Sequence, residues 1–305
     1  MKLDDGKELL SICIPTRNRI AFLKDLLETI RKQVLEEELG EDVAIYVSDN
    51  ASDDGTQELC RGWIGRLPRF YYSRNSENIG ADANILHVRT LGRGQYVWVY
   101  GDDDILQERA IANVVNLLRK ESPGVIVAVH SKYGLPKPPP GNYEDYRAYA
   151  KTCIQKNAHV LGEQSLITSN IHRADCYDVE YAREQLDTHL AQMYGLVRKV
   201  YESRAKVVVP DFPVISLSDN LIGSTEAWIN LDASWVVYFT WLRSELDLPA
   251  LDPLEPSRIA RRLMLRQIVL NPFGYLWQHR KQLANPTAWR FALRRLMGRH
   301  GAGYP

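Results

Sequence analysis

Residues 96–106 of this chain read YVWVYGDDDIL. A run of β-branched and aromatic residues, Tyr96–Tyr100, meets one glycine and then the three aspartates Asp102–Asp104. Such a run predicts a buried strand. Three adjacent carboxylates at the end of a buried strand repel one another and lose hydration. They stay ionised only if a cation or strong hydrogen-bond donors compensate them. The stretch therefore predicts a polar binding site where this strand ends.

On both sides of this stretch, short apolar runs alternate with segments of helical spacing. Residues 9–15 (LLSICIP) form an apolar run closed by proline, whereas residues 21–34 carry apolar side chains every three or four positions. Strands that alternate with helices of this length predict βαβ units, and so an α/β fold with a mostly parallel sheet. The proline- and glycine-rich segment 133–143 predicts a loop. The other predicted strands are 43–47, 70–72, 96–100, 124–130 and 164–172, and the other predicted helices are 56–64, 82–91, 110–119 and 179–200.

Charge divides the chain into an acidic body and a basic tail. Ten of the 38 Lys and Arg residues lie in residues 257–305, which hold no Asp or Glu. The remaining 28 basic residues face 38 acidic ones in residues 1–256, a balance of −10. Beyond about Asn220 the pattern also changes to tryptophan-rich helix. We therefore predict one α/β domain over residues 1–220 and a helical, basic region over residues 221–305.

The sequence favours a cytoplasmic protein. Its four cysteines lie far apart without metal-ligand spacing, which is typical of reduced thiols in an intracellular protein. The first residues, MKLDDGKELL, lack the basic and apolar segments of a signal peptide. The longest apolar run, about residues 233–242, is too short to span a bilayer.

Polar clusters are predicted at several strand ends of one sheet. They are Thr16–Arg19, Ser48–Asn50, Asp102–Asp104 and the group Asn78, Gly80, Asp82 and Asn84. In an open α/β sheet, ligands bind outside the carboxyl ends of the strands. Oxygen ligands on a short loop suit Mg²⁺ or Mn²⁺, which typically bind through one or two carboxylates plus substrate phosphates. The alternative is that the aspartates only cap the following helix.

Four motifs follow one another within roughly residues 8–120: ICIPTRNR, YVSDNASDDGT, RNSENIGADANI and GQYVWVYGDDDIL. In this order and spacing they resemble the family 2 glycosyltransferases of GT-A fold. The chain is most similar to the group that includes abequosyltransferases and other O-antigen or cell-surface sugar transferases. The resemblance implies a nucleotide-sugar half over about residues 8–120 and an acceptor half over about 121–220. It also implies transfer of a sugar from a nucleotide-diphosphate donor to an acceptor hydroxyl, with Mg²⁺ or Mn²⁺ and inversion at the anomeric carbon.

The resemblance also implies roles for individual residues. Asp49 would accept a hydrogen bond from the base or ribose, and Asp103 and Asp104 would hold the metal on the diphosphate. Many relatives carry an aspartate where this chain has Gly101, so which two of the three aspartates bind the metal stays open. The residues implied in nucleotide-sugar binding are Pro15, Thr16, Arg17, Asn18, Asp49, Asn78, Gly80, Asn84 and Asp102.

An inverting transfer needs a general base near the acceptor hydroxyl. The family commonly carries this base in a helical segment that resembles residues 186–190 (LDTHL), which identifies Asp187 as the expected base. His189 is a candidate metal or phosphate partner. Asp175 and Asp178 are alternative bases. The non-catalytic interpretations are a solvated helix aspartate for Asp187 and a hydrogen-bonded structural histidine for His189.

The basic tail predicts either membrane contact or core packing. Trp289, Leu293 and Leu296 recur at helical spacing among arginines, which is typical of a helix on anionic headgroups and equally of a core-packed terminal helix. A lipid-linked or surface glycan acceptor would bring the enzyme to the inner face of the membrane.

Two other functions compete with glycosyl transfer. A sugar nucleotidyltransferase would need a glycine-rich loop and a lysine that ICIPTRNR lacks. A non-catalytic glycan- or nucleotide-binding relative would fit Gly101. We expect no nucleic-acid partner, because the body is acidic.

Overall fold

The computed structural model describes residues 7–128, 137–157, 161, 164–216 and 225–253, apart from the side chains of residues 157, 187 and 225–234. The chain divides into two compact units, Met1–Ser218 and Asp219–Pro305, and each is described by itself.

The first unit is built on a mixed sheet with the strand order β3-β2-β1-β4-β8-β6-β9-β7. Strands β1 to β4 run parallel, as do β6 and β9, whereas β8 runs antiparallel to both β4 and β6, and β7 antiparallel to β9. A small second sheet pairs β5 with β10. The strands are β1 Leu10–Thr16, β2 Val43–Asp49, β3 Phe70–Arg74, β4 Tyr96–Val99, β5 Ile105–Leu106, β6 Val125–Val127, β7 Gly141–Tyr143, β8 Asn170–Arg173, β9 Val207–Val209 and β10 Ile215–Ser216.

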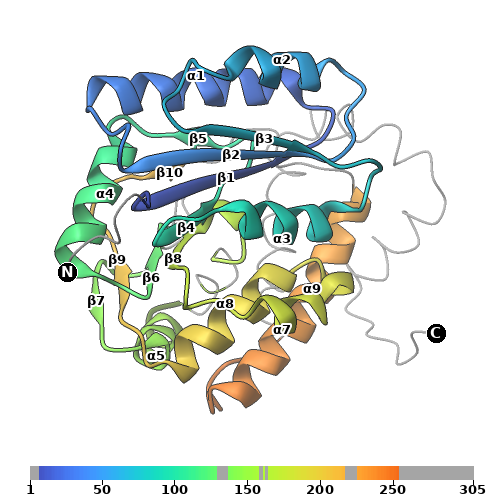
Figure 1. Ribbon diagram of the computed structural model, residues 1–305. Coiled ribbons are helices and arrows are strands. Elements are labelled where there is room, and N and C mark those ends of the chain that lie inside the picture. The colour runs from blue at the N-terminus through green and yellow to red at the C-terminus, as the bar shows by residue number, and fades with distance from the viewer. Residues whose placement is uncertain (1–6, 129–136, 158–160, 162–163, 217–224, 254–305) are drawn as a thin grey trace, which may run out of the picture. The chain divides into compact units, whose positions relative to one another are not determined.

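Helices cover both faces of the sheet (Figure 1). Helices α1 and α2 lie over one face, and α3, α7 and α8 lie over the other. The alternation of side chains along β1 explains these two layers, because neighbouring residues of a strand point to opposite faces. Ile12 and Ile14 join the large core that includes Leu23 of α1, while Cys13 joins a smaller cluster with Val88 of α3. The helices of this unit are α1 Ile20–Glu36, α2 Thr56–Trp63, α3 Ala81–Leu91, α4 Ala110–Glu121, α5 Tyr146–Asn157, α7 Val179–Arg183 and α8 Ala191–Glu202, with 3-10 turns η1 Ile167–Ser169 and η2 Leu186–Thr188.

The predicted α/β fold with a mostly parallel sheet is confirmed, and two local predictions are wrong. The predicted strand 164–172 begins only at Asn170, because residues 167–169 form η1. The predicted loop 133–143 ends in the edge strand β7, where prolines that precede the strand are tolerated. Residues 179–200, predicted to be mostly helical, form α7, η2 and α8, and His189 with φ 58° leaves helical geometry between η2 and α8.

The second unit contains helix α9, Thr225–Glu245. In the parts of the chain that the structure describes, no helix is both long and apolar enough to cross a membrane. The basic tail, 257–305, with its predicted amphipathic helix, lies outside the described residues.

Candidate functional site

The strand order brings three of the predicted polar clusters to one edge of the sheet. Strand β1 lies between β2 and β4, with Thr16 paired to Asp49 and Cys13 paired to Val99. Since these strands are parallel, their carboxyl ends meet at the same edge. The segments that follow them therefore face one another: residues 17–19 after β1, residues 50–55 after β2 and residues 100–104 after β4.

The first aspartate of the triplet is held by the segment after β1. The Thr16 hydroxyl donates to Asp102 Oδ2 at 2.7 Å, and one guanidinium nitrogen of Arg19 donates to Asp102 Oδ1 at 2.8 Å. The same Arg19 nitrogen lies 3.0 Å from Asp103 Oδ2. Burial raises the pKa of Asp102, although Arg19 and the Thr16 hydrogen bond oppose that rise. Arg19 is thus the cation that partly compensates the triplet in the protein itself.

The third aspartate turns toward the segment before β8. Asp104 Oδ2 accepts a hydrogen bond from the Thr168 hydroxyl, and this hydroxyl accepts the Gly101 amide N–H at 2.8 Å. Burial raises the pKa of Asp104 to about 7, opposed by the Thr168 hydrogen bond and reinforced by the charges of Asp103 and Asp102. Negative charge is therefore under-compensated at Asp104.

The donor set fits a divalent cation shared with a substrate. Within the described residues, no group of three His, Cys, Asp or Glu side chains converges on one point, so His189 does not join Asp103 and Asp104 in a three-ligand site. The second carboxylate oxygens of Asp103 and Asp104 accept no hydrogen bond in the described part of the chain. Hard carboxylate oxygens whose negative charge is only partly compensated suit Mg²⁺ or Mn²⁺, and these ions complete their coordination shells with phosphate and water.

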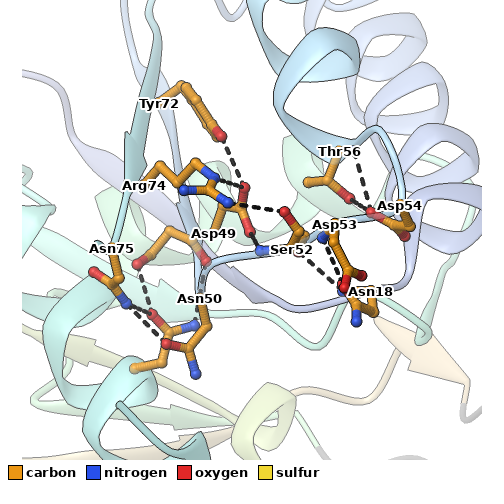
Figure 2. Close-up of polar contacts among 12 residues, drawn as sticks. Asn18, Asp49, Asn50, Ser52, Asp53, Asp54, Thr56, Tyr72, Arg74 and Asn75 are labelled. Atoms are coloured by element: carbon orange, nitrogen blue, oxygen red, sulfur yellow. Dashed lines mark hydrogen bonds and ion pairs between the residues drawn. The ribbon is translucent and has the colours of Figure 1, made fainter. Parts of the chain in front are cut away.

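Asp49 is fully buried and its carboxylate is already occupied (Figure 2). Oδ2 accepts from the Tyr72 hydroxyl at 2.8 Å and lies 3.4 Å from Arg74 Nε, while Oδ1 accepts the Ser52 amide at 2.8 Å. The buried carboxylate therefore fixes the segment after β2 through these contacts, and neither of its oxygens lies at the surface.

The segments after β1 and β2 are fastened to each other (Figure 2). The Asn18 side-chain oxygen accepts the backbone N–H of Asp53 at 2.9 Å, and the backbone N–H of Asn18 donates to the Ser52 hydroxyl at 2.9 Å. Asp54 accepts from the Ile20 amide at 2.9 Å and from the Thr56 hydroxyl at 2.6 Å, so it serves the first turns of both α1 and α2. Burial raises the pKa of Asp54, but these hydrogen bonds lower it more and hold it below its usual value.

The asparagine-rich segment before α3 folds back onto the end of β2. Asn50 donates to Asn78 Oδ1 at 2.8 Å and accepts the Ile79 amide at 2.9 Å. Asn84 is buried, accepts from the Ser48 hydroxyl at 2.7 Å and donates to the Ser48 carbonyl at 3.2 Å. Among the nucleotide-binding candidates, Asn84 is thus internally satisfied, whereas Arg17, Asn18, Asn78 and Gly80 are exposed.

The candidate bases are less well defined. The Asp187 side chain lies outside the described residues, and His189 is exposed. Asp175 follows β8, where Arg173 pairs with Tyr96 at the start of β4, so it lies at the edge opposite the aspartate triplet. It is also bound to Arg173 at 2.6 Å. Asp178 caps α7 by accepting the Tyr181 amide at 2.9 Å. Neither alternative base is free beside the triplet.

Three contributors to the site were missing from the predicted residues. Arg19 was recognised only as part of a polar cluster, although a basic residue directly after β1 is a usable signal. Arg74 ends β3 and donates to the Ser52 carbonyl at 2.9 Å. Thr168 stands far from the triplet in the sequence, and no local pattern marks it.

A small cavity lies between the sheet and helices α3 and α8. Its volume is about 20 Å³, room for about one water molecule, and Arg89, His172, Tyr177 and Gln192 are among its lining residues. His172 Nδ1 lies 3.0 Å from the Arg173 carbonyl, and Nε2 has no hydrogen-bond partner in the described part of the chain. Burial, with a contribution from the Arg89 charge, lowers the pKa of His172 to about 3.

This buried neutral histidine predicts a loss of stability in mild acid. In the unfolded chain the imidazole binds a proton near pH 6.5, whereas in the folded chain it does so only near 3. The unfolded state therefore binds more protons below pH 6.5, and the free energy of unfolding falls between pH 6.5 and 3, by about 2 kcal/mol at pH 5. In urea titrations, the free energy of unfolding should fall between pH 7.5 and 5.0 by about 2 kcal/mol less in His172→Gln than in the wild type. His87→Gln, on α3, is the control and should behave as wild type; equal losses in all three proteins would contradict the assignment.

The motifs at this edge have counterparts in known proteins. Residues 11–172 match the family model described as glycosyl transferase family 2. Over 105 residues the chain is 42% identical to the abequosyltransferase RfbV of Salmonella typhimurium, a match that covers 34% of this chain and 31% of that protein. This chain thus spans about a third of the length of that relative.

Solved structures share the fold. S. aureus TarS, residues 1–349, superposes with a TM-score of 0.56 at 14% identity, covering 88% of this chain and 74% of that one. The mannosyltransferase PcManGT from Pyrobaculum calidifontis, solved with GDP-Man and Mn²⁺, superposes with a TM-score of 0.54 at 15% identity, covering 96% and 85%. These likenesses establish the GT-A fold. Since the family model spans more than half of the 305 residues and agrees with the motifs at the sheet edge, the chain belongs to glycosyltransferase family 2.

Proposed function

We propose that the protein transfers a sugar from a nucleoside-diphosphate sugar to an acceptor hydroxyl, with inversion and with the aid of Mg²⁺ or Mn²⁺. The observation that carries this proposal is the convergence of Thr16, Arg19 and the aspartate triplet at one sheet edge, with negative charge left over at Asp103 and Asp104. The solved complex of PcManGT with GDP-Man and Mn²⁺ supports the ligand class.

Each aspartate of the triplet has a distinct task in this proposal. Asp102 is the anchor, because Thr16 and Arg19 already occupy its two oxygens. Asp103, whose side chain is 17% exposed, and Asp104 hold the metal through their remaining oxygens. The metal would stabilise the charge that develops on the leaving diphosphate.

The nucleotide-binding residues divide into contacting and supporting groups. Arg17, Asn18, Asn78 and Gly80 are exposed, and we propose that they contact the donor together with the half-buried Pro15. Asp49 and Asn84 are buried and satisfied, so we propose that they support the donor site by fixing the backbone around it. This support replaces the direct hydrogen bond to base or ribose that the family resemblance implied for Asp49.

A donor screen tests the proposed reaction class. Thermal unfolding should be measured with each common nucleoside diphosphate and its sugars, with and without Mn²⁺. We expect one nucleoside diphosphate to raise the Tm by several degrees, and only when the metal is present. No stabilisation by any of them, with or without metal, would argue for a protein that binds glycan without a nucleotide donor.

Asp187 is the proposed general base, although its side chain is outside the described residues. Replacing its carboxylate by an amide removes the proton acceptor and leaves the donor site untouched. Asp187→Asn should therefore keep the donor-induced Tm shift and lose about 100-fold or more in turnover. Glu184→Gln, an exposed position on the same connection, is the control and should keep turnover. An Asp187→Asn protein with full turnover would refute the assignment.

The basic tail, residues 257–305, bears on the acceptor and on the location of the protein. We propose a glycan or glycolipid acceptor and a cytoplasmic protein that meets the inner face of the membrane through residues 257–305, which lie outside the described residues. Flotation with anionic and neutral liposomes tests this contact. Binding only to anionic liposomes, lost when residues 257–305 are removed, is expected; equal soluble fractions would contradict it.

A further inference from the structure

Thr168 joins the acceptor half of the domain to the aspartate triplet. It lies in η1, directly before β8, and its side chain is fully buried. Its hydroxyl accepts the Gly101 amide N–H at 2.8 Å and donates to Asp104 Oδ2. A single side chain therefore fixes both the backbone that begins the triplet and the carboxylate that ends it.

The position of Thr168 is itself fixed from several directions. Trp98 of β4, fully buried, donates its indole N–H to the Thr168 carbonyl at 2.8 Å. The segment around it is tied by Gln164 and Asn170, which donate to each other at 2.9 and 2.8 Å. The Gln192 side chain of α8 adds a hydrogen bond to the Ser165 carbonyl at 3.1 Å. Because the segment is held in this way, the hydroxyl meets Asp104 without needing to be ordered first.

The third part of the arrangement is the glycine at position 101. A Cβ atom placed there would lie 3.0 Å from Asp104 Oδ2 and 3.2 Å from the Thr168 hydroxyl. Both distances are tighter than ordinary contacts. The close approach of Thr168 to the triplet therefore depends on the missing side chain at Gly101.

We propose that Thr168 is a positioning residue that holds Asp104 in the orientation in which its other oxygen can bind the metal. Its hydroxyl binds Oδ2 and so leaves Oδ1 available to bind a metal ion, while the hydrogen bond from the Gly101 amide fixes the turn that carries all three aspartates. This inference rests on the proposed metal-dependent function. It adds that the segment before β8, on the acceptor side, sets the geometry of the metal site.

The decisive comparison is between Thr168→Val and Thr168→Ser. Valine keeps the shape and removes the hydroxyl, whereas serine keeps the hydroxyl. Binding is measured by calorimetry with Mn²⁺ and inorganic pyrophosphate, a diphosphate probe that needs no knowledge of the base. We expect Thr168→Val to weaken binding about tenfold and Thr168→Ser to stay within about twofold of wild type. Thr152→Val is the matched control, because the Thr152 hydroxyl donates only to the Ala148 carbonyl of its own helix. It should bind as wild type.

A second measurement needs no metal. The unfolding equilibria of wild type, Thr168→Val, Asp104→Ala and the double variant form a cycle. We expect the double variant to depart from additivity by about tenfold in the unfolding constant, since Thr168→Val removes the donor and Asp104→Ala the acceptor of the same hydrogen bond. If Thr168→Val does not fold, Thr168→Ser is compared with Thr168→Ala in both measurements.

The outcomes separate the two proposals. Wild-type binding by the variants that lack the hydroxyl, or an additive cycle, would overturn the role of Thr168. If the wild type itself does not bind Mn²⁺ with pyrophosphate, the metal-dependent function fails. The cycle then still decides whether Thr168 holds Asp104.

Discussion

Replacing Asp103 with asparagine should abolish metal-dependent binding of the nucleoside diphosphate. The Asp103 side chain is 17% exposed and its second carboxylate oxygen accepts no hydrogen bond in the described part of the chain, and the amide has the same shape without the charge. We expect the affinity for nucleoside diphosphate in the presence of Mn²⁺ to fall about 100-fold or more, or about 2.7 kcal/mol, as measured by calorimetry.

The same substitution should leave the metal-free protein as stable as wild type or more stable. Loss of one of three adjacent negative charges relieves repulsion, and Arg19 keeps its 2.8 Å contact with Asp102. The metal-free Tm and the metal-dependent affinity should therefore not fall together. Asp25→Asn, an exposed aspartate on α1, is the matched control and should change neither. Undiminished Mn²⁺-dependent binding by Asp103→Asn would show that Asp103 is not a metal ligand.

Introducing an aspartate at Gly101, where the family resemblance implies one, should impair this protein. Any side chain at this position begins 3.0 Å from Asp104 Oδ2 and 3.2 Å from the Thr168 hydroxyl, and a fourth carboxylate would add charge to an under-compensated triplet. Gly101→Asp should lower the free energy of unfolding by roughly 1–3 kcal/mol and weaken Mn²⁺-dependent binding. Chemical denaturation and calorimetry measure the two effects.

Two further glycine variants separate space from charge. Gly101→Ala adds only the Cβ atom, so it should show part of the stability loss without the added repulsion. Gly62→Ala, within α2 and with no atom within 4 Å of the new Cβ, should instead gain up to about 1 kcal/mol from helix propensity. If Gly101→Asp were as stable as wild type and bound Mn²⁺ more tightly, Gly101 would be a lost ligand position and not a requirement of the Thr168 contact.

The sequence leaves open which two of the three carboxylates bind the metal, and the variants at Asp103 and Gly101 test this. Contacts divide the triplet: Asp102 binds Thr16 and Arg19, Asp104 binds Thr168, and Asp103 keeps one carboxylate oxygen that accepts no hydrogen bond in the described part of the chain. Arg19 bridges Asp102 and Asp103 through one nitrogen. Its cation offsets part of the charge before any metal binds.

The sequence by itself determined the α/β fold, the positions of the first four strands along the chain and the polar clusters that follow strand ends. These depend on local signals: apolar runs such as residues 96–100 form strands, and apolar residues at helical spacing, such as residues 21–34, form helices. The parallel arrangement then places the strand ends at one edge. The family motifs lie within this local part of the pattern, which is why the resemblance identified the family correctly.

Only the tertiary structure decided which polar side chains of the site are buried and what each of them contacts. Asp49 and Asn84 are polar residues at strand and helix ends in the sequence, but they are buried with their hydrogen bonds satisfied by neighbours such as Tyr72 and Ser48. Thr168 meets Asp104 across 64 residues of chain, a contact set by the antiparallel pairing of β8 with β4. Local periodicity carries no information about which side chains such a pairing brings within 3 Å. The question posed by three adjacent aspartates was therefore visible in the sequence, whereas the groups that compensate and orient them became visible only in the fold.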